Sequence, residues 1–154
     1  MGVASRRMDE QAELRLWDQV INFEQSLAAL HTEVMVLKAA LPIAGSEQFL
    51  SLARQAAEGE GVRMAGIAQP GVGIVHLGLW AERLGAVTER LVTNVRKSAE
   101  SLGGALVVEQ YPAGFAGERD VWGAPGDVLQ WMRGLKAVWD PRGILSPGRF
   151  VGGI

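Results

Sequence analysis

Short segments with alternating strand-like and helix-like apolar spacing, separated by glycine and proline, make up the middle of this chain. Runs of β-forming residues that end at a turn residue predict strands. Apolar residues that recur at the 3.6-residue period predict helices. The predicted strands are 33–41, 62–69, 73–80 and 105–111, and the predicted helices between them are 47–58 and 81–102. The order β-α-β-β-α-β is that of the ferredoxin-like split βαβ arrangement, so we expect an α+β fold with an antiparallel sheet.

Local turn chemistry supports these boundaries. Pro70-Gly71-Val72-Gly73 lies between two strand-like runs and predicts a hairpin. Ser46 is a favourable N-cap for the first helix, and Gly59 suits the position just past its end. Gly103-Gly104 is expected to end the second helix in the same way.

A further helix is predicted at each end of this core. Residues 9–30 carry apolar side chains along one side of a helix, and residues 127–139 do the same. The second helix must stop before Pro141, because the residue before a proline disfavours the helical conformation. We therefore expect residues 1–30 to form a tail and a connector helix, and residues 31–154 to form one domain.

Composition narrows the function. The chain has 154 residues, 48% of them hydrophobic and 21% charged, which is typical of one globular domain. A net charge of -2 provides no basic surface for nucleic acid, so no nucleic-acid partner is expected. The absence of cysteine excludes disulfides and thiolate chemistry and favours a reducing, cytoplasmic location. No apolar run approaches the roughly 20 residues that a membrane-spanning helix needs.

The C-terminal segment L-K-A-V-W-D-P-R-G-I-L-S-P-G-R-F-V-G-G-I is the most distinctive stretch. It resembles the C-terminal signature of FAD-linked oxidases of the vanillyl-alcohol-oxidase superfamily. Within that group it is most similar to the FAD-binding subunit of bacterial glycolate oxidase. The matching positions are Lys136, Asp140, Pro141, Gly143, Leu145, Pro147, Gly148 and Arg149. Ser146 departs from the pattern, which usually has asparagine there.

This resemblance implies a role and partners. Residues 31–154 would be the cap, or substrate, domain of an FAD-dependent 2-hydroxy-acid oxidase of the glycolate type. FAD would be held mainly by a separate FAD-binding domain that this sequence lacks, so we expect a fragment or the detached cap of a split enzyme, inactive on its own. Implied partners are that domain, a second flavoprotein and an iron-sulfur subunit, with a homodimer as a further option. Association with a membrane would come through those subunits.

The resemblance also implies a cofactor contact. In relatives, the residue before Pro-Gly lies beside the isoalloxazine ring and the following basic residue lies near the cofactor or domain junction. Carried over, this makes Ser146, Pro147, Gly148 and Arg149 the candidate cofactor-binding residues. The alternative is a plain turn that folds the tail onto another domain.

Strand alternation selects a second group of candidates. If two helices cover one face of the sheet, the side chains of Lys38, His76, Trp80, Glu109 and Tyr111 share the other, open face. We take His76 as a candidate catalytic base, and Lys38, Glu109 and Tyr111 as candidate substrate-binding residues. A structural histidine and a cross-strand Lys38–Glu109 ion pair are the alternatives.

Two histidines without cysteine give no metal-ligand spacing, so no metal site is expected. A different class of function also fits the sequence. A ferredoxin-like domain can act as a non-catalytic ligand-binding or subunit-assembly module, with the open face of its sheet as the docking surface.

Overall fold

A computed structural model describes residues 7–113, 115 and 120–154. Residues 1–6, at the start of the predicted tail, and residues 114 and 116–119 lie outside the described residues. The helices are α1 (Glu10–Ile21), α2 (Phe23–Leu30), α3 (Ser46–Gly59), α4 (Val87–Ser101) and α5 (Val128–Trp139). The strands are β1 (Val34–Ala40), β2 (Arg63–Gln69), β3 (Ile74–Trp80) and β4 (Ala105–Gln110), and short 3-10 turns lie at Ile43–Gly45, Pro70–Val72 and Val151–Gly153.

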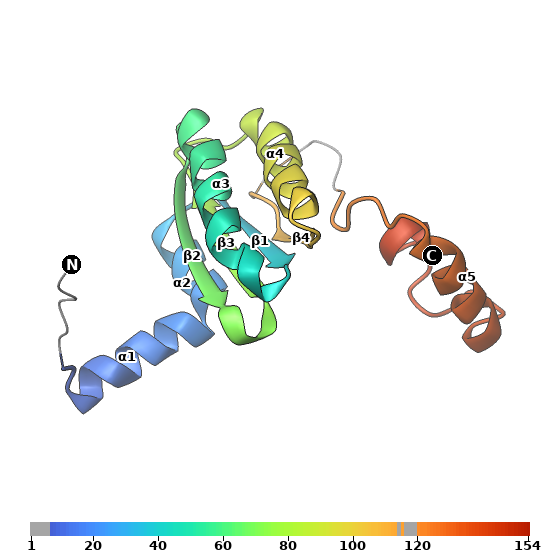
Figure 1. The fold of residues 1–154 in the computed structure, drawn as a ribbon, viewed down its shortest axis with the longest axis horizontal. Helices are drawn as coiled ribbons and strands as arrows, with labels where there is room; N and C mark the ends of the chain where they lie inside the picture. Colours follow the sequence, from blue (N-terminus) through green and yellow to red (C-terminus); the bar gives the residue numbers. More distant parts are fainter. Residues whose placement is uncertain (1–6, 114, 116–119) are drawn as a thin grey trace.

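The strands form one antiparallel sheet in the order β2-β3-β1-β4 (Figure 1). With α3 and α4 between the strands in sequence, this confirms the predicted α+β class and the β-α-β-β-α-β order. The hairpin between β2 and β3 is also confirmed. Its turn needs Gly73, because φ is +68° there and a Cβ would lie 2.0 Å from the carbonyl oxygen of Leu41.

Helices α3 and α4 pack on one face of the sheet and enclose the main core. This core takes alternate residues from the central strands, and Phe49, Leu91 and Val95 from the helices. The fully buried strand residues on this side include Met35, Leu37, Ala39, Val75, Leu77 and Leu79.

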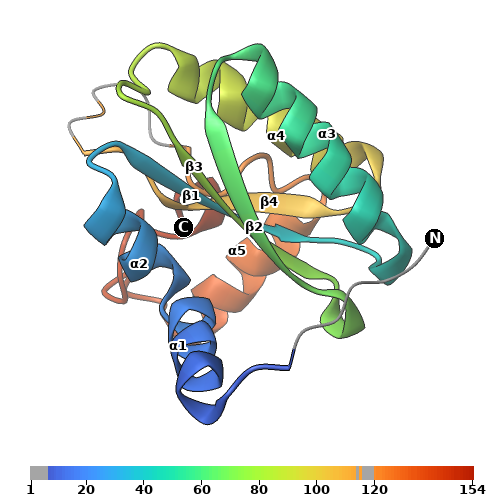
Figure 2. The same cartoon turned by 90° about the vertical axis from the view of Figure 1, so that its left-hand side faces the viewer.

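The opposite face is only partly open, because α2 lies over part of it (Figure 2). Leu27 of α2 packs with Val34 and Val36 of β1, and Phe23 and Trp80 border this smaller cluster. Gly78 permits the contact, since a Cβ there would lie 2.0 Å from Leu27 Cδ1. The segment predicted as a connector therefore covers part of the face that strand alternation left uncovered.

Two helix predictions need correction. The predicted helix 9–30 is two helices, because the backbone leaves helical geometry at Asn22 (φ -101°, ψ 38°). The predicted helix 81–102 begins only at Val87, since the preceding turn places Leu84 in the core and passes through Gly85 at φ +28°.

The ends of α3 also differ from expectation. Ser46 is the first residue of the helix rather than its cap, and its buried Oγ has no hydrogen-bond partner among the described residues. At the other end Gly61, not Gly59, adopts the left-handed conformation. Amides 61 and 62 donate to the carbonyls of Glu58 and Ala57, which is a Schellman ending.

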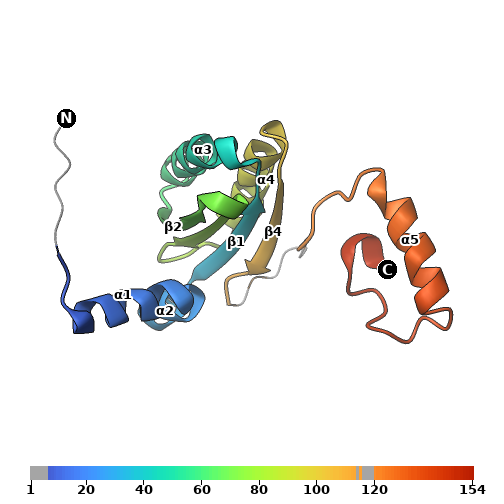
Figure 3. The same cartoon turned by 60° about the horizontal axis from the view of Figure 1, so that its bottom comes forward.

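Helix α5 and the tail after it stand apart from the sheet (Figures 1 and 3). No residue of α5 is buried. Arg96 of α4 holds the start of the connecting segment, with its guanidinium 2.9 Å from both Asp120 Oδ2 and the Asp120 carbonyl oxygen. Among the helices of the described part, none is long and apolar enough to cross a membrane.

The fit of Leu27 against Gly78 gives a direct test of how α2 is held. We expect Gly78→Ala to lower the free energy of unfolding by about 1–3 kcal/mol, the usual cost of overpacking a tight contact. Gly71→Ala is the matched control, since a Cβ at Gly71 meets nothing within 4 Å. Urea unfolding of both variants measures the difference, and equal stabilities would contradict the packing described for α2.

Candidate functional site

The carboxylate of Asp140 organises the turn that follows α5. Its Oδ1 accepts a hydrogen bond from the amide of Ile144 at 2.9 Å, and its Oδ2 accepts one from the amide of Leu145 at 2.9 Å. Lys136, one turn earlier on α5, places its Nζ 2.9 Å from the same Oδ2. One buried carboxylate therefore satisfies two backbone donors and ties the turn to the helix.

These contacts lower the pKa of Asp140. The hydrogen bond from the Leu145 amide is the largest cause, followed by the one from Lys136, while burial acts in the opposite direction. Lys136 Nζ also donates to the carbonyl oxygen of Leu145. Gly143 completes the turn in the left-handed conformation, with φ +62°. Lys136, Asp140, Gly143 and Leu145 thus act together as a structural unit.

The following residues reverse the chain direction. Ser146 has φ +46°, a left-handed conformation that non-glycine residues other than Asn and Asp rarely adopt. The tail then returns to α5, where a Cβ on Gly152 would lie 2.4 Å from Leu129 Cδ1. Phe150 meets the ring of Trp122 edge-on at 5.1 Å. Trp122 Nε1 donates to the carbonyl oxygen of Arg149 at 3.3 Å, which fixes the tail against the segment before α5.

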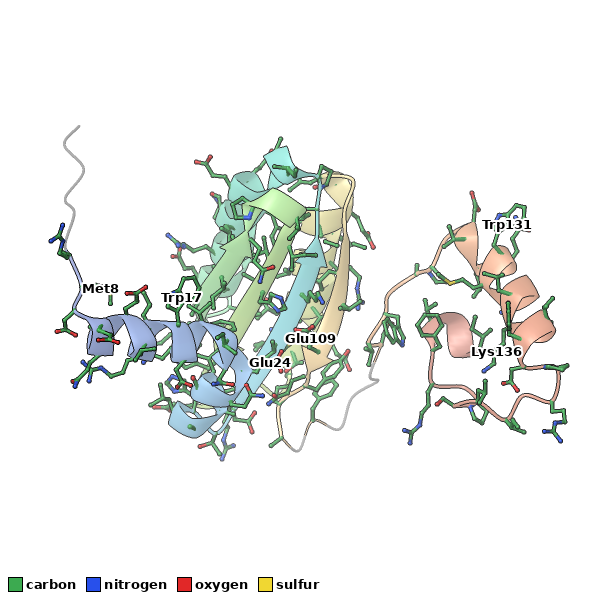
Figure 4. The ribbon with its side chains drawn as sticks, turned by 90° about the horizontal axis from the view of Figure 1, so that it is seen from below. Met8, Trp17, Glu24, Glu109, Trp131 and Lys136 are labelled. Carbon is green, nitrogen blue, oxygen red and sulfur yellow. The ribbon has the colours of Figure 1, made fainter. Side chains whose placement is uncertain are left out.

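A hollow of about 480 Å³ lies between α5 and the returning tail. It is walled mainly by apolar side chains, and Figure 4 shows Lys136 on the side of α5 that faces the tail. The lining residues are Met132, Leu135, Lys136, Trp139, Leu145, Ser146, Phe150 and Ile154. Of the four candidate cofactor-binding residues only Ser146 lines this hollow; Pro147, Gly148 and Arg149 form the turn beside it.

The chemistry of this hollow suits one part of a flavin. An apolar wall with one hydroxyl fits a flat aromatic ring, such as the isoalloxazine. A pyrophosphate would instead need a cluster of backbone amides or cationic side chains. The wall provides one ammonium, that of Lys136, and Asp140 already pairs with it. The lining of this hollow therefore suits an apolar ring better than a phosphate group.

A second group of polar residues lies on the α2 side of the sheet. Lys38 of β1 is the direct cross-strand partner of His76 of β3, so both project from the same face. Glu109 of β4 joins them, with Oε2 3.2 Å from His76 Nδ1 and Oε1 3.8 Å from Lys38 Nζ. The structure thus brings together Lys38, His76 and Glu109, as strand alternation predicted; their roles in catalysis and substrate binding stay predictions.

The prediction that Tyr111 shares the face of Lys38 and His76 is wrong, because β4 contains an irregularity in register. Val36 pairs with Gln110 while Leu37 pairs with Val108, which leaves Glu109 as an extra residue. The extra residue turns Tyr111 to the opposite face, where it packs against the main core. Its hydroxyl donates to the carbonyl oxygen of Asp120 at 2.9 Å.

Trp80 does lie on the α2 side, but it serves a different contact. Its ring stacks on that of His31 with centroids 4.7 Å apart. It also borders the apolar cluster formed by Leu27, Val34 and Val36. This placement fits a packing role for Trp80.

Sequence reasoning missed Glu24. This residue lies on α2, and Figure 4 shows it directed toward Glu109. Carboxyl oxygens of Glu24 and Glu109 and a ring nitrogen of His76 all lie within 4.8 Å of one another. The prediction of one connector helix over 9–30 assigned no packing partner to the turn that carries Glu24. The apolar pair Phe23 and Leu27, at i and i+4, was the available signal that this turn packs against the sheet.

Lys38 adds one positive charge beside the two carboxyl groups. Glu109 lies between Lys38 and His76, with Oε1 3.8 Å from Lys38 Nζ and Oε2 3.2 Å from His76 Nδ1. The group borders a hollow of about 580 Å³ over β1 and β4. Its other walls include Val107, Val121 and Trp122, so the hollow has a charged end and an apolar end.

Comparison with known proteins bears on the tail alone. Residues 122–150 match the family model of the C-terminal domain of FAD-linked oxidases. This range covers α5, the Asp140 turn and the Ser146 turn, and it supports an FAD-linked oxidase C-terminal domain. No curated protein sequence matches the chain.

The Asp140 turn should be sensitive to acid. Because the folded-state pKa is lowered, the stabilisation is complete above the ordinary carboxyl pKa and is lost as pH falls through the lowered value. In amide NMR spectra, the Ile144 and Leu145 signals should titrate together below about pH 3.9, the ordinary aspartate value. Asp140→Asn should abolish this titration. A transition at the ordinary value would contradict the hydrogen bonding described here.

The backbone of Ser146 predicts the effect of substitution. Asn and Gly tolerate φ +46° better than Ser, so Ser146→Asn and Ser146→Gly should slow hydrogen exchange at the Arg149 amide, which donates to the Ser146 carbonyl. Ser146→Val should accelerate it; each change corresponds to about 1 kcal/mol, or about fivefold in rate. Ser51→Asn, on the exposed side of α3, is the control. An Arg149 exchange rate that none of the three Ser146 variants changes would rule out backbone strain at Ser146.

Proposed function

We propose that this chain is the C-terminal cap of an FAD-dependent 2-hydroxy-acid oxidase, of the glycolate oxidase subunit type. The observation that carries the proposal is the unit formed by α5 and its tail. Its sequence matches the C-terminal domain of FAD-linked oxidases, and its fold builds an apolar wall with Ser146 at the edge. Large apolar side chains of α5 remain exposed to solvent around this wall.

The exposed side chains indicate where the rest of the enzyme would lie. Trp131, Val138 and Trp139 of α5 are 72%, 74% and 79% exposed. Large contiguous apolar surfaces of this kind mark contacts with another domain or subunit. In the proposal, an FAD-binding domain covers this surface, and a second flavoprotein and an iron-sulfur subunit complete the assembly.

Each group of residues then has a chemical role. FAD, when bound, supplies a hydride acceptor for the carbon that carries the substrate hydroxyl. The apolar side chains of the tail exclude water from the ring that they cover. Lys38 offers an ammonium to a substrate carboxylate, and the hollow beside it is large enough for a small hydroxy acid.

His76 is the proposed proton acceptor. Its Nδ1 faces Glu109, and in the proposal Nε2, which has no hydrogen-bond partner in the part of the chain that the structure describes, takes the proton of a substrate hydroxyl. The hydrogen bond to Glu109 orients the ring, as a carboxylate does for a catalytic histidine. Glu109 is thereby a positioning residue in the proposal, and Lys38 holds Glu109 in place when no substrate is bound.

A non-catalytic assembly module is the second candidate, and a specific observation favours it. Helix α1 also exposes large apolar residues, among them Leu14, Trp17 and Ile21. A domain with apolar helices at both ends can join two partners without any chemistry of its own. The two candidates differ in one observable property, which is the presence of flavin in the assembled protein.

The test is to isolate the protein from its source together with the polypeptides that accompany it. The enzyme proposal expects a flavin spectrum that bleaches under anaerobic conditions when glycolate or another 2-hydroxy acid is added. Leu145→Lys, at the apolar wall, should lower flavin content at least about tenfold, because a charge would have to be desolvated against the ring. Val72→Lys, on the exposed hairpin turn, is the control for surface charge.

Two results would separate the candidates. An assembly that contains no flavin refutes the oxidase and leaves the module. A flavoprotein that bleaches with none of the 2-hydroxy acids retains the FAD-linked oxidase and refutes the substrate class.

A further inference from the structure

Helix α2 is attached to the sheet by a small contact. It has eight residues and begins directly after the break at Asn22. Leu27 is its one buried residue, and Phe23 adds a partly buried ring. An eight-residue helix has little stability by itself, so the contacts that hold it on the sheet decide whether it forms.

Charged groups from four elements meet at the edge of this contact. Glu24 comes from α2, Lys38 from β1, His76 from β3 and Glu109 from β4. Glu109 lies 3.2 Å from the His76 ring nitrogen and 3.8 Å from the Lys38 ammonium. Glu24 approaches from α2, with a carboxyl oxygen within 4.8 Å of a carboxyl oxygen of Glu109 and of a ring nitrogen of His76.

The contact between the two carboxyl groups has a chemical requirement. Carboxyl oxygens of Glu24 and Glu109 lie within 4.8 Å of each other. Ionised carboxylates repel each other and only accept hydrogen bonds, so a direct bond between the two groups needs one proton. Burial against the sheet favours that proton on Glu24, while Glu109 makes the contacts to Lys38 and His76.

The electrostatics of Glu24 agree with this geometry. Burial against the sheet is the first cause that raises its pKa, followed by repulsion from Glu109 and the hydrogen bond to it. His76 and Lys38 act in the opposite direction but do not cancel these effects. Two like charges that approach this closely titrate as a pair, with one ionisation easier than the other.

We propose that Glu24 and Glu109 share one proton across the contact between α2 and the sheet, and that this proton controls how firmly α2 covers the sheet. The proposal concerns the folded chain alone and does not rest on flavin binding. A folded-state pKa above the ordinary value means that the stabilisation is complete below the ordinary carboxyl pKa. It is lost as pH rises through the raised value, so α2 is held more firmly in acid than at neutral pH.

The first measurement is a pH titration in which carbon NMR monitors the side-chain carboxyl groups of Glu24 and Glu109. We expect the Glu24 signal to titrate above the ordinary carboxyl pKa, because burial and Glu109 raise the pKa of Glu24. Glu109→Gln should move that titration toward the ordinary value, since it removes the neighbouring charge. A Glu24 titration that Glu109→Gln leaves unchanged would overturn the shared proton.

The second measurement is hydrogen exchange in α2, which a purely packing role for Glu24 would not make pH-dependent. The probe is the His31 amide, which donates to the Leu27 carbonyl at the end of α2. Glutamine keeps the shape of glutamic acid but carries no charge, so at pH 7 this amide should exchange several-fold more slowly in Glu24→Gln than in the unmodified chain. The ratio of the two exchange rates should fall toward one near pH 4. Glu13→Gln, on the first turn of α1, removes the same charge away from the group and should show a ratio near one throughout.

A constant ratio for Glu24→Gln across this pH range would overturn the proposal. So would a divalent cation at this position, because it would keep both carboxylates ionised. Exchange measured with added zinc and with EDTA tests that case. Zinc-dependent protection of α2 that Glu24→Gln removes would identify a cation site in place of a shared proton.

Discussion

The first strand is apolar on both faces, and the arrangement of the remaining elements follows from that constraint. Val34, Met35, Val36 and Leu37 are consecutive and almost fully buried. Alternate residues of a strand point to opposite faces, so four such residues in a row require cover on both sides. Helices α3 and α4 provide it on one side, and the eight-residue helix α2, which contacts Gly78, provides it on the other. The second cover is small, so polar groups at its edge bear strongly on its stability.

Regular patterns in the sequence predict the sheet well, because they depend on local periodicity. The order of elements along the chain, the hairpin and the common face of Lys38 and His76 all follow from periodicity and turn chemistry. Predictions fail where one residue changes the backbone direction. The break at Asn22 separates α2 from α1, and the extra residue at Glu109 reverses Tyr111. Neither event leaves a periodic signal, since each depends on contacts made only in the folded chain.

The candidate site could also be predicted only in part. The sequence motif identifies the tail, and the structure shows that Lys136, Asp140 and Gly143 of this motif shape the turn through contacts within the chain. The hollow beside Ser146 could not be predicted, because it depends on the return of Phe150 and Ile154 to α5. The contacts of Glu24 could not be predicted either, since its partners His76 and Glu109 come from two strands distant in sequence.

The α5–tail unit makes most of its contacts within itself, and this has a consequence for how its sequence can change. A turn closed by one carboxylate, two amides and an ammonium accepts few replacements at those positions, because the geometry is set atom by atom. An apolar core accepts many combinations of side chains of similar volume. Substitutions should therefore be tolerated more widely in the core of the sheet than in the last thirty or so residues.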